Sequence, residues 1–118
     1  MTVQRIEQAG NKEALALWYK VTLHHVRKDA FDLSARQMAL LLTVYTQGDG
    51  HTVRGLSEQL NVSKPAICRA LDTITKYNLI ERKVDETDRR NVFIVPTDSG
   101  YDFLGGFSDD IMAFLLEM

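Results

Sequence analysis

The chain has 118 residues, 45% of them hydrophobic and 25% charged, and a formal net charge of −2, which are the proportions of one ordinary globular domain. No apolar run is long enough to cross a membrane and no apolar secretory segment opens the chain, so we expect neither a membrane protein nor a secreted one. The single cysteine, Cys68, excludes an intramolecular disulfide and favours a cytoplasmic location.

The charge is distributed unevenly along the chain. Residues 1–50 carry +1 (six basic, five acidic), residues 51–96 carry +2 (eight basic, six acidic), and residues 97–118 carry −5 (five acidic, no basic). Because binding to phosphates depends on where Lys and Arg side chains gather, the slightly acidic total does not exclude a nucleic-acid partner.

Two helices are predicted in the first half of the chain. Asn11 is a suitable N-cap for a helix over residues 11–31, in which apolar side chains recur at helical spacing. Ser34 begins a second helix, which stops at the glycine-rich residues 48–50. The stretch that follows, residues 51–53, is too short for more than a bridging strand.

A pair of short helices comes next. Leu56 and Leu60 lie on the first of them, and Ser63 caps the second. Asn61 in the turn between the helices and Asn78 after the second suit the left-handed backbone conformation. The second helix has an apolar face at helical spacing, made of Ile67, Ala70, Leu71 and Ile74.

The remainder of the chain predicts a hairpin and a last helical stretch. Residues 79–84 and 92–95 are β-rich runs separated by polar, turn-forming residues. Pro96 ends the second run and Thr97 caps the helical stretch. The glycines at 105–106 weaken the middle of that stretch, so one kinked helix and two short helices both fit.

This order of elements predicts an α+β fold, mostly α: a winged helix-turn-helix with flanking N- and C-terminal helices. We expect residues 1–118 to form a single winged-helix domain. Residues 34–96 would be its central lobe, with the wing at 80–96, and residues 1–33 and 97–118 would be flanking helical elements.

The second short helix has the pattern of a helix that reads DNA. The N-terminal half of its predicted free face is small and basic, as entry into a major groove requires. The alternative is an ordinary helical hairpin with a solvated outer face. The predicted free face consists of Ser63, Lys64, Pro65, Ala66, Cys68, Arg69 and Asp72.

The hairpin loop strengthens the DNA interpretation. Arg89 and Arg90 are adjacent at its tip, where a wing beside a recognition helix can place arginine in the minor groove. Asp88 is better explained as a partner that orients one of these arginines than as a DNA contact, since a carboxylate repels phosphate. A solvated charge cluster is the simpler alternative for this loop.

The segment "LSEQLNVSKPAICRALDTITKYNLIERKVDETDRRNVFIVPTDSG" resembles the DNA-binding lobe of the MarR family of bacterial regulators, and "LSARQMALLLTVY" extends the resemblance upstream. The resemblance implies that residues 34–96 are a DNA-binding lobe and that residues 1–33 and 97–118 are helical dimerisation or packing elements, the N- and C-terminal dimerisation helices of the fold. It also implies a homodimer on a pseudo-palindromic double-stranded DNA operator, often a repressor that is released by a small-molecule effector or an oxidant. It implies that Arg89 enters the minor groove and that Arg90 contacts a phosphate or an internal partner. The positions that match the family's major-groove contacts are Ser63, Lys64, Pro65, Ala66 and Arg69.

Family members usually continue through a further helix, whereas this chain stops at Met118. We therefore expect the dimer surface to come from residues 1–30 and from the apolar C-terminal side chains Phe107, Ile111, Met112, Phe114, Leu115 and Leu116.

Other residues suggest sites on weaker grounds. Cys68, beside Lys64 and Arg69, could be a redox switch, although the family's oxidant sensors generally carry their cysteine near the N-terminus. An aromatic effector pocket could form, although such residues at helical spacing are more often core or dimer contacts. The residues of this predicted effector pocket are Trp18, Tyr19, His25 and Tyr45.

No metal, cofactor or enzyme activity is expected. The histidines His24, His25 and His51 have no cysteine or carboxylate cluster beside them to complete a metal site, and no catalytic motif is present. The alternative function is a winged-helix module or anti-regulator that binds protein rather than DNA. The acidic C-terminal segment and the missing terminal helix favour this alternative.

Overall fold

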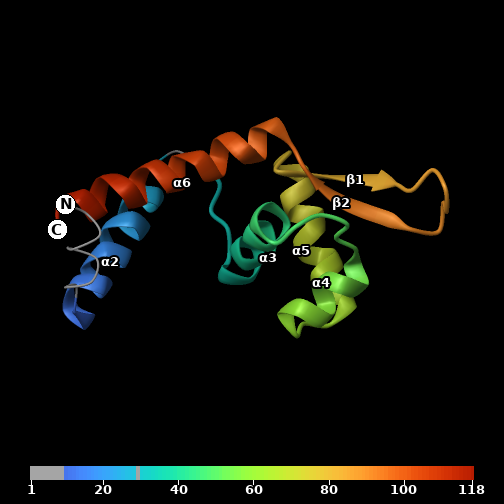
Figure 1. Cartoon of the computed structure of the whole chain (residues 1–118), viewed down its shortest axis with the longest axis horizontal. Coiled ribbons are helices and arrows are strands. Elements are labelled where there is room, and N and C mark those ends of the chain that lie inside the picture. Colours follow the sequence, from blue (N-terminus) through green and yellow to red (C-terminus); the bar gives the residue numbers. More distant parts are fainter. Residues whose placement is uncertain (1–9, 29) are drawn as a thin grey trace. The chain divides into compact units, whose positions relative to one another are not determined.

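A computed structural model describes residues 10–28 and 30–118 of the chain (Figure 1). The first nine residues of the predicted element at 1–33, and residue 29, lie outside the described residues. The predicted α+β, mostly α, winged-helix class is confirmed. The elements in chain order are α2 (Asn11–Arg27), α3 (Ala35–Thr46), α4 (Val53–Leu60), α5 (Lys64–Lys76), β1 (Ile80–Val84), β2 (Val92–Pro96) and α6 (Asp98–Leu116).

The chain divides into two compact units, which are described separately. The larger unit is Leu33–Asp102, and the smaller unit is Met1–Asp32 with Phe103–Met118. No helix in the described part of the chain is long and apolar enough to span a membrane.

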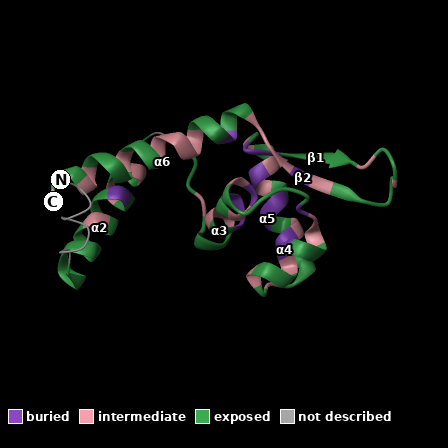
Figure 2. Cartoon of the chain, viewed as in Figure 1, coloured by how far each residue is buried: buried purple, intermediate pink, exposed green. Residues whose placement is uncertain are grey.

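The core of the larger unit is shared by α3, α4, α5 and the hairpin (Figure 2). Each helix buries the apolar face that its helical spacing creates, and each large aliphatic side chain removed from water contributes about 1.5–3 kcal/mol. The fully buried side chains of this core include Leu40, Leu41, Leu56, Ile67, Leu71, Ile74, Leu79, Ile80 and Ile94.

Three predicted helix caps are confirmed. Ser34 Oγ accepts the Gln37 N–H at 3.1 Å, and Gln37 Oε1 accepts the Ser34 N–H at 2.9 Å, so the two residues satisfy each other. Ser63 Oγ accepts the Ala66 N–H at 3.4 Å, and Thr97 Oγ1 accepts the Gly100 N–H at 2.9 Å. These side chains fix where α3, α5 and α6 begin.

The start of α2 differs from the prediction. The N-cap is Gly10 rather than Asn11, and Asn11 is already the first helical residue. The Glu13 carboxylate reaches back and accepts the Gly10 N–H at 3.2 Å, which stabilises this earlier start. The helix also ends sooner than residue 31, because Lys28 adopts an extended backbone.

Helix α6 is continuous from Asp98 to Leu116. The alternative of two short helices is therefore wrong. A glycine costs about 1 kcal/mol in a helix relative to alanine, but this local cost does not break a helix whose two ends are held by packing.

The hairpin pairs β1 and β2 antiparallel, with Ile80 opposite Pro96 and Val84 opposite Val92. As expected, residues 51–53 form no more than a bridge, in which the Ile94 N–H donates to the His51 carbonyl at 2.8 Å. The pairing is confined to this one bridge because Val53 already begins α4. The bridge ties the base of the wing to the turn before α4.

In the smaller unit, α2 packs antiparallel against the C-terminal part of α6. Lys28 Nζ lies 3.0 Å and His24 Nε2 3.5 Å from the carboxylate of Asp110, while Lys20 Nζ lies 3.7 Å from Glu117. Val21, on the same face of α2, is buried. Since residues 20, 21, 24 and 28 recur at helical spacing, this face of α2 is occupied by α6.

Candidate nucleic-acid interface

The turn between α4 and α5 sets the two short helices against each other. Asn61 has a φ of 55°, as predicted, and Asn78 after α5 has a φ of 60°. The Val62 N–H donates to the Ser57 carbonyl at 3.1 Å, and Ser57 Oγ donates to the Val62 carbonyl at 2.6 Å. These bonds hold the tight turn that a helix-turn-helix requires.

The exposed face of α5 carries four of the five residues predicted for it at the major groove. Ser63, Lys64, Pro65 and Arg69 are all exposed. Pro65 lies in the first turn of the helix, where its missing N–H would have no partner in any case. The N-terminal half of α5 therefore offers a small, basic surface.

Ala66 departs from this face. Only 7% of it is exposed, so the prediction that it lies on the free face is wrong. Ala66, Ala70 and Ile74 are spaced four residues apart and share the buried side of α5. Cys68 is half-buried with a free thiol, and its redox role remains a prediction.

The two arginines at the wing tip differ in their hydrogen bonds. Arg90 donates to Asp88 twice through its side chain, from Nε and from Nη2, both at 3.0 Å, and its backbone N–H donates to the same carboxylate at 3.2 Å. Arg89 is exposed and makes no hydrogen bond or ion pair with any part of the chain that the structure describes. The orienting role of Asp88 is thus directed at Arg90.

The acidic residues of the wing build its turns. Asp85 Oδ1 accepts the Thr87 N–H at 2.9 Å and the Thr87 hydroxyl at 2.7 Å, which lowers the pKa of the Asp85 carboxyl. The Arg90 side chain, and then its backbone N–H, lower the pKa of the Asp88 carboxyl, while that carboxylate raises the pKa of the Arg90 guanidinium. Both carboxylates are therefore used in loop geometry.

One ion pair joins the hairpin to α5. Arg82 Nη2 on β1 lies 2.8 Å from Asp72 Oδ1 on α5. Asp72 is an acid on the otherwise basic side of α5, and Arg82 balances its charge from within the chain. Sequence interpretation did not find this pair, since nothing local in the sequence brings position 82 to position 72.

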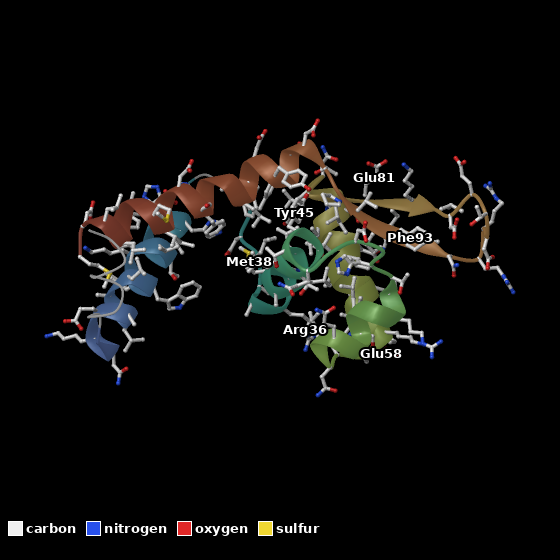
Figure 3. The ribbon with its side chains drawn as sticks, in the orientation of Figure 1. Arg36, Met38, Tyr45, Glu58, Glu81 and Phe93 are labelled. Atoms are coloured by element: carbon white, nitrogen blue, oxygen red, sulfur yellow. The ribbon has the colours of Figure 1, made fainter. Side chains whose placement is uncertain are left out.

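Another basic residue that sequence interpretation missed is Arg36, in the first turn of α3 (Figure 3). Arg36 and Arg69 line the same open recess on the larger unit, although they are far apart in the sequence. Ser34 predicts the start of α3, but no signal in the sequence indicates that Arg36 lies beside α5.

The residues of the predicted effector pocket fall in different surroundings. Trp18 and Tyr19 are largely exposed on α2. The ring of His25 lies 4.6 Å from that of Phe107 and 5.9 Å from that of Phe103, measured between centroids. Trp18, Tyr19 and His25 belong to the smaller unit, whereas Tyr45 belongs to the larger one. The pocket stays a prediction.

The hydroxyl of Tyr45 is committed to internal hydrogen bonds in the larger unit. It donates to the Leu79 carbonyl and accepts the Thr97 N–H at 3.0 Å. The ring also meets that of Tyr101 edge-on, with centroids 4.9 Å apart. Tyr45 thereby links α3 to the residue before β1 and to the residue after β2.

The described residues contain no group of three or more His, Cys, Asp or Glu side chains that could hold a metal ion. His24 instead pairs with Asp110, and His51 Nε2 lies 3.2 Å from the Gly48 carbonyl.

A tight two-helix turn followed by a hairpin with a basic tip defines the class of winged helix-turn-helix proteins. Residues 33–92, just over half of the chain, match the MarR family. The chain belongs to the MarR family and is a transcriptional regulator of that type.

Solved structures agree with this assignment. A mutant of MepR from S. aureus is 25% identical, with a TM-score of 0.69 over 85% of this chain and 71% of that one. The transcriptional regulator Tm0710 from Thermotoga maritima is 19% identical, with a TM-score of 0.74 over 97% and 78%. CouR from Rhodococcus jostii, bound to p-coumaroyl-CoA, is 24% identical, with a TM-score of 0.59 over 70% and 57%. The last two similarities concern the fold alone.

The chain spans 71%, 78% and 57% of the lengths of these three proteins, respectively. Comparison with curated proteins finds no match.

Proposed function

We propose that the protein binds double-stranded DNA in a sequence-specific manner, as a homodimer on a pseudo-palindromic operator, and acts as a repressor in the cytoplasm. The single observation that carries this proposal is the contrast at the wing tip. Arg90 is held by Asp88, whereas the adjacent Arg89 is exposed and its guanidinium donates no hydrogen bond to any residue that the structure describes. A loop built to display one unpaired arginine suits the minor groove.

The recognition helix supports the same partner. Its exposed start, Ser63 to Pro65, is small and basic, and Arg69 follows one turn later on the exposed side. A helix with this face can enter a major groove without steric or electrostatic conflict. Arg90 would contact a phosphate through the guanidinium N–H groups that do not bind Asp88.

A homodimer is proposed because α2 has a second apolar face. Leu15, Trp18, Tyr19 and Val26 lie at helical spacing away from the face that packs on α6, and each is more than 60% exposed. Such a stripe on a helix indicates a protein contact, and a two-fold operator requires two copies. The recognition helices of the dimer would lie about 34–36 Å apart, one turn of DNA.

Regulation by a small-molecule effector is part of the proposal. It is suggested by the family and by CouR, whose structure holds p-coumaroyl-CoA. An effector would act by favouring a dimer in which the spacing of the two recognition helices no longer matches DNA.

The test is a salt series of binding to sheared genomic DNA. We expect the affinity to fall as salt rises, and Arg89→Ala to weaken binding and reduce the slope of log affinity against log salt by about one unit. Lys76→Ala, which removes an exposed cation from the last turn of α5, is the matched control and should leave the slope unchanged.

Two outcomes would contradict the proposal. The absence of detectable binding even at low salt would favour the protein-binding alternative. An Arg89→Ala variant that binds like the wild type would remove the wing from the interface.

A further inference from the structure

We propose that Arg36, Arg69 and the first turn of α3 form a phosphate-binding recess that holds one backbone phosphate of the bound DNA. The inference rests on the proposed function and adds a third docking point to the recognition helix and the wing. It also assigns Arg69, which was predicted among the major-groove contacts, to the DNA backbone.

The recess is a defined feature of the larger unit. It has a volume of about 460 Å³ and is open to solvent. Three of its lining residues are alanines, so short side chains bound much of the space that Arg36 and Arg69 also line. The lining consists of Ser34, Ala35, Arg36 and Gln37 from the start of α3 and of Ala66, Arg69, Ala70 and Thr73 from α5.

The charge at this recess is positive and uncompensated. None of its lining residues is acidic. Neither Arg36 nor Arg69 donates a side-chain hydrogen bond or forms an ion pair within the described residues. Three other arginines of the same unit have an acidic partner, Arg54 with Glu58 at 3.4 Å, Arg82 with Asp72 and Arg90 with Asp88, whereas Arg89 at the wing tip has none among the described residues. Guanidinium groups that face one space from two helices match the oxygens of a phosphate.

The backbone of α3 adds donors on the same side. The N–H groups of Ser34 and Gln37 are already used in their mutual cap. In the first turn of a helix the amides of the next positions, here Ala35 and Arg36, have no carbonyl partner within the helix. Together with the positive end of the helix dipole, they complete a surface that favours an anion.

The recess borders the predicted DNA surface. Arg69 is shared between the recess and the exposed face of α5 that begins at Lys64. A strand of DNA whose groove receives the start of α5 would therefore bring its backbone to this side. Because a phosphate carries no sequence information, Arg69 is expected to add affinity without discrimination between sequences.

The experiment uses the full chain and a duplex selected by the wild-type protein from a random-sequence library, with a scrambled duplex beside it. We expect Arg36→Gln and Arg69→Gln each to weaken binding of both duplexes by a similar factor, about tenfold. The double variant should lower the salt slope by about one phosphate's contribution, roughly 0.9, and no more, because both arginines serve the same phosphate. Lys76→Gln, the same change of charge at the far end of α5, should do neither.

A second variant tests the space itself. Ala35→Glu would add a carboxylate to the lining of the recess, where it should repel a phosphate, while an acidic residue in the first turn favours the helix. We expect weaker DNA binding with an unchanged or higher melting temperature. Arg36→Lys, which keeps the charge, should recover most of the binding that Arg36→Gln loses.

Phosphate ethylation and a titration with inorganic phosphate separate the remaining outcomes. Ethylation of one phosphate per half-site should weaken binding by the wild type but not by the double variant. If the wild type binds DNA while Arg36→Gln behaves like Lys76→Gln, the recess is not a docking point and the proposed function stands. If inorganic phosphate shifts the Ala35 and Arg36 amide signals but DNA binding ignores both arginines, the recess serves a free anion and the inference is overturned. A wild type that binds no DNA overturns the proposed function itself.

Discussion

Two adjacent arginines at the wing tip show how neighbours decide what a side chain is available to do. Asp88 accepts three hydrogen bonds from Arg90, and Asp85 accepts two from Thr87. The crowding of acids in this loop therefore has a local structural cause, because each carboxylate closes a turn. Of the two arginines, Arg89 is thus the one that has no acidic partner among the residues that the structure describes.

This arrangement makes a prediction about the titration of Asp88. The bonds from Arg90 lower the pKa of its carboxyl from the ordinary 3.8, against smaller opposing effects of desolvation and of the Asp85 charge. A lowered pKa in the folded chain means that the ion pair stabilises the wing above pH 3.8 and that this stabilisation is lost as the pH falls through the lower folded value. We expect the NMR titration of the Asp88 carboxyl to have its midpoint below 3.8.

The two arginines supply the matched pair of variants for this titration. Arg90→Gln should move the midpoint back toward 3.8, whereas Arg89→Gln removes the same charge one residue away and should leave it almost unmoved. Equal shifts in the two variants would mean that general charge, and not the specific pair, controls Asp88.

At the scale of single residues, the sequence predicts well where chemistry is local. The partnership of Asp88 with an arginine and the left-handed asparagines 61 and 78 follow from short-range preferences. The position of Ala66 could also have been predicted, because its spacing from Ala70 and Ile74 puts it on the buried face. Arg36 could not, since its role depends on two helices approaching each other.

The elements themselves begin where side chains can satisfy backbone groups. Ser34, Ser63 and Thr97 were predictable starts because each can accept a nearby N–H. The continuity of α6 was not predictable, because the local preference of two glycines competes with packing that the sequence does not display. Phe103 and Phe107, on either side of the glycines, both contact His25 of α2.

Replacement of Gly105 by alanine should therefore stabilise the protein. A Cβ at this position would meet no atom within 4 Å, and alanine is favoured over glycine in a helix by about 0.5–1 kcal/mol. We expect Gly105→Ala to raise the free energy of unfolding in urea by about that amount, measured at fixed protein concentration.

Gly100→Ala is the counterpart in the same helix and should have the opposite sign. Its Cβ would overlap the Tyr45 hydroxyl and the Leu79 carbonyl, which are bonded to each other. If Gly105→Ala were to destabilise the chain, the space around Gly105 would have to be filled in solution, for instance by a second copy.

For the whole molecule, the distribution of charge and apolar surface separates two tasks. Residues 51–96, with a net charge of +2, contain the recognition helix and the wing, while residues 97–118 carry −5. The smaller unit combines charged side chains of both signs with exposed apolar ones such as Trp18 and Val26. This composition suits contact with protein better than contact with DNA, and it is the basis for placing the dimer surface there.

The dimer makes the last prediction. Trp18 is 65% exposed at the centre of the apolar stripe on α2, so a charge there should cost the individual chain little but should be buried without a partner in a dimer. We expect Trp18→Asp to sediment as a monomer at concentrations at which the wild type is dimeric.

Asn11→Asp adds the same charge in the first turn of α2, where an acid is tolerated, and should remain dimeric. DNA affinity should fall with the loss of the dimer, because one half-site then supplies all the contacts. If the Trp18→Asp variant remains dimeric, the dimer interface does not include this stripe. If it is monomeric but binds DNA with undiminished affinity, the proposal of a two-fold operator is wrong.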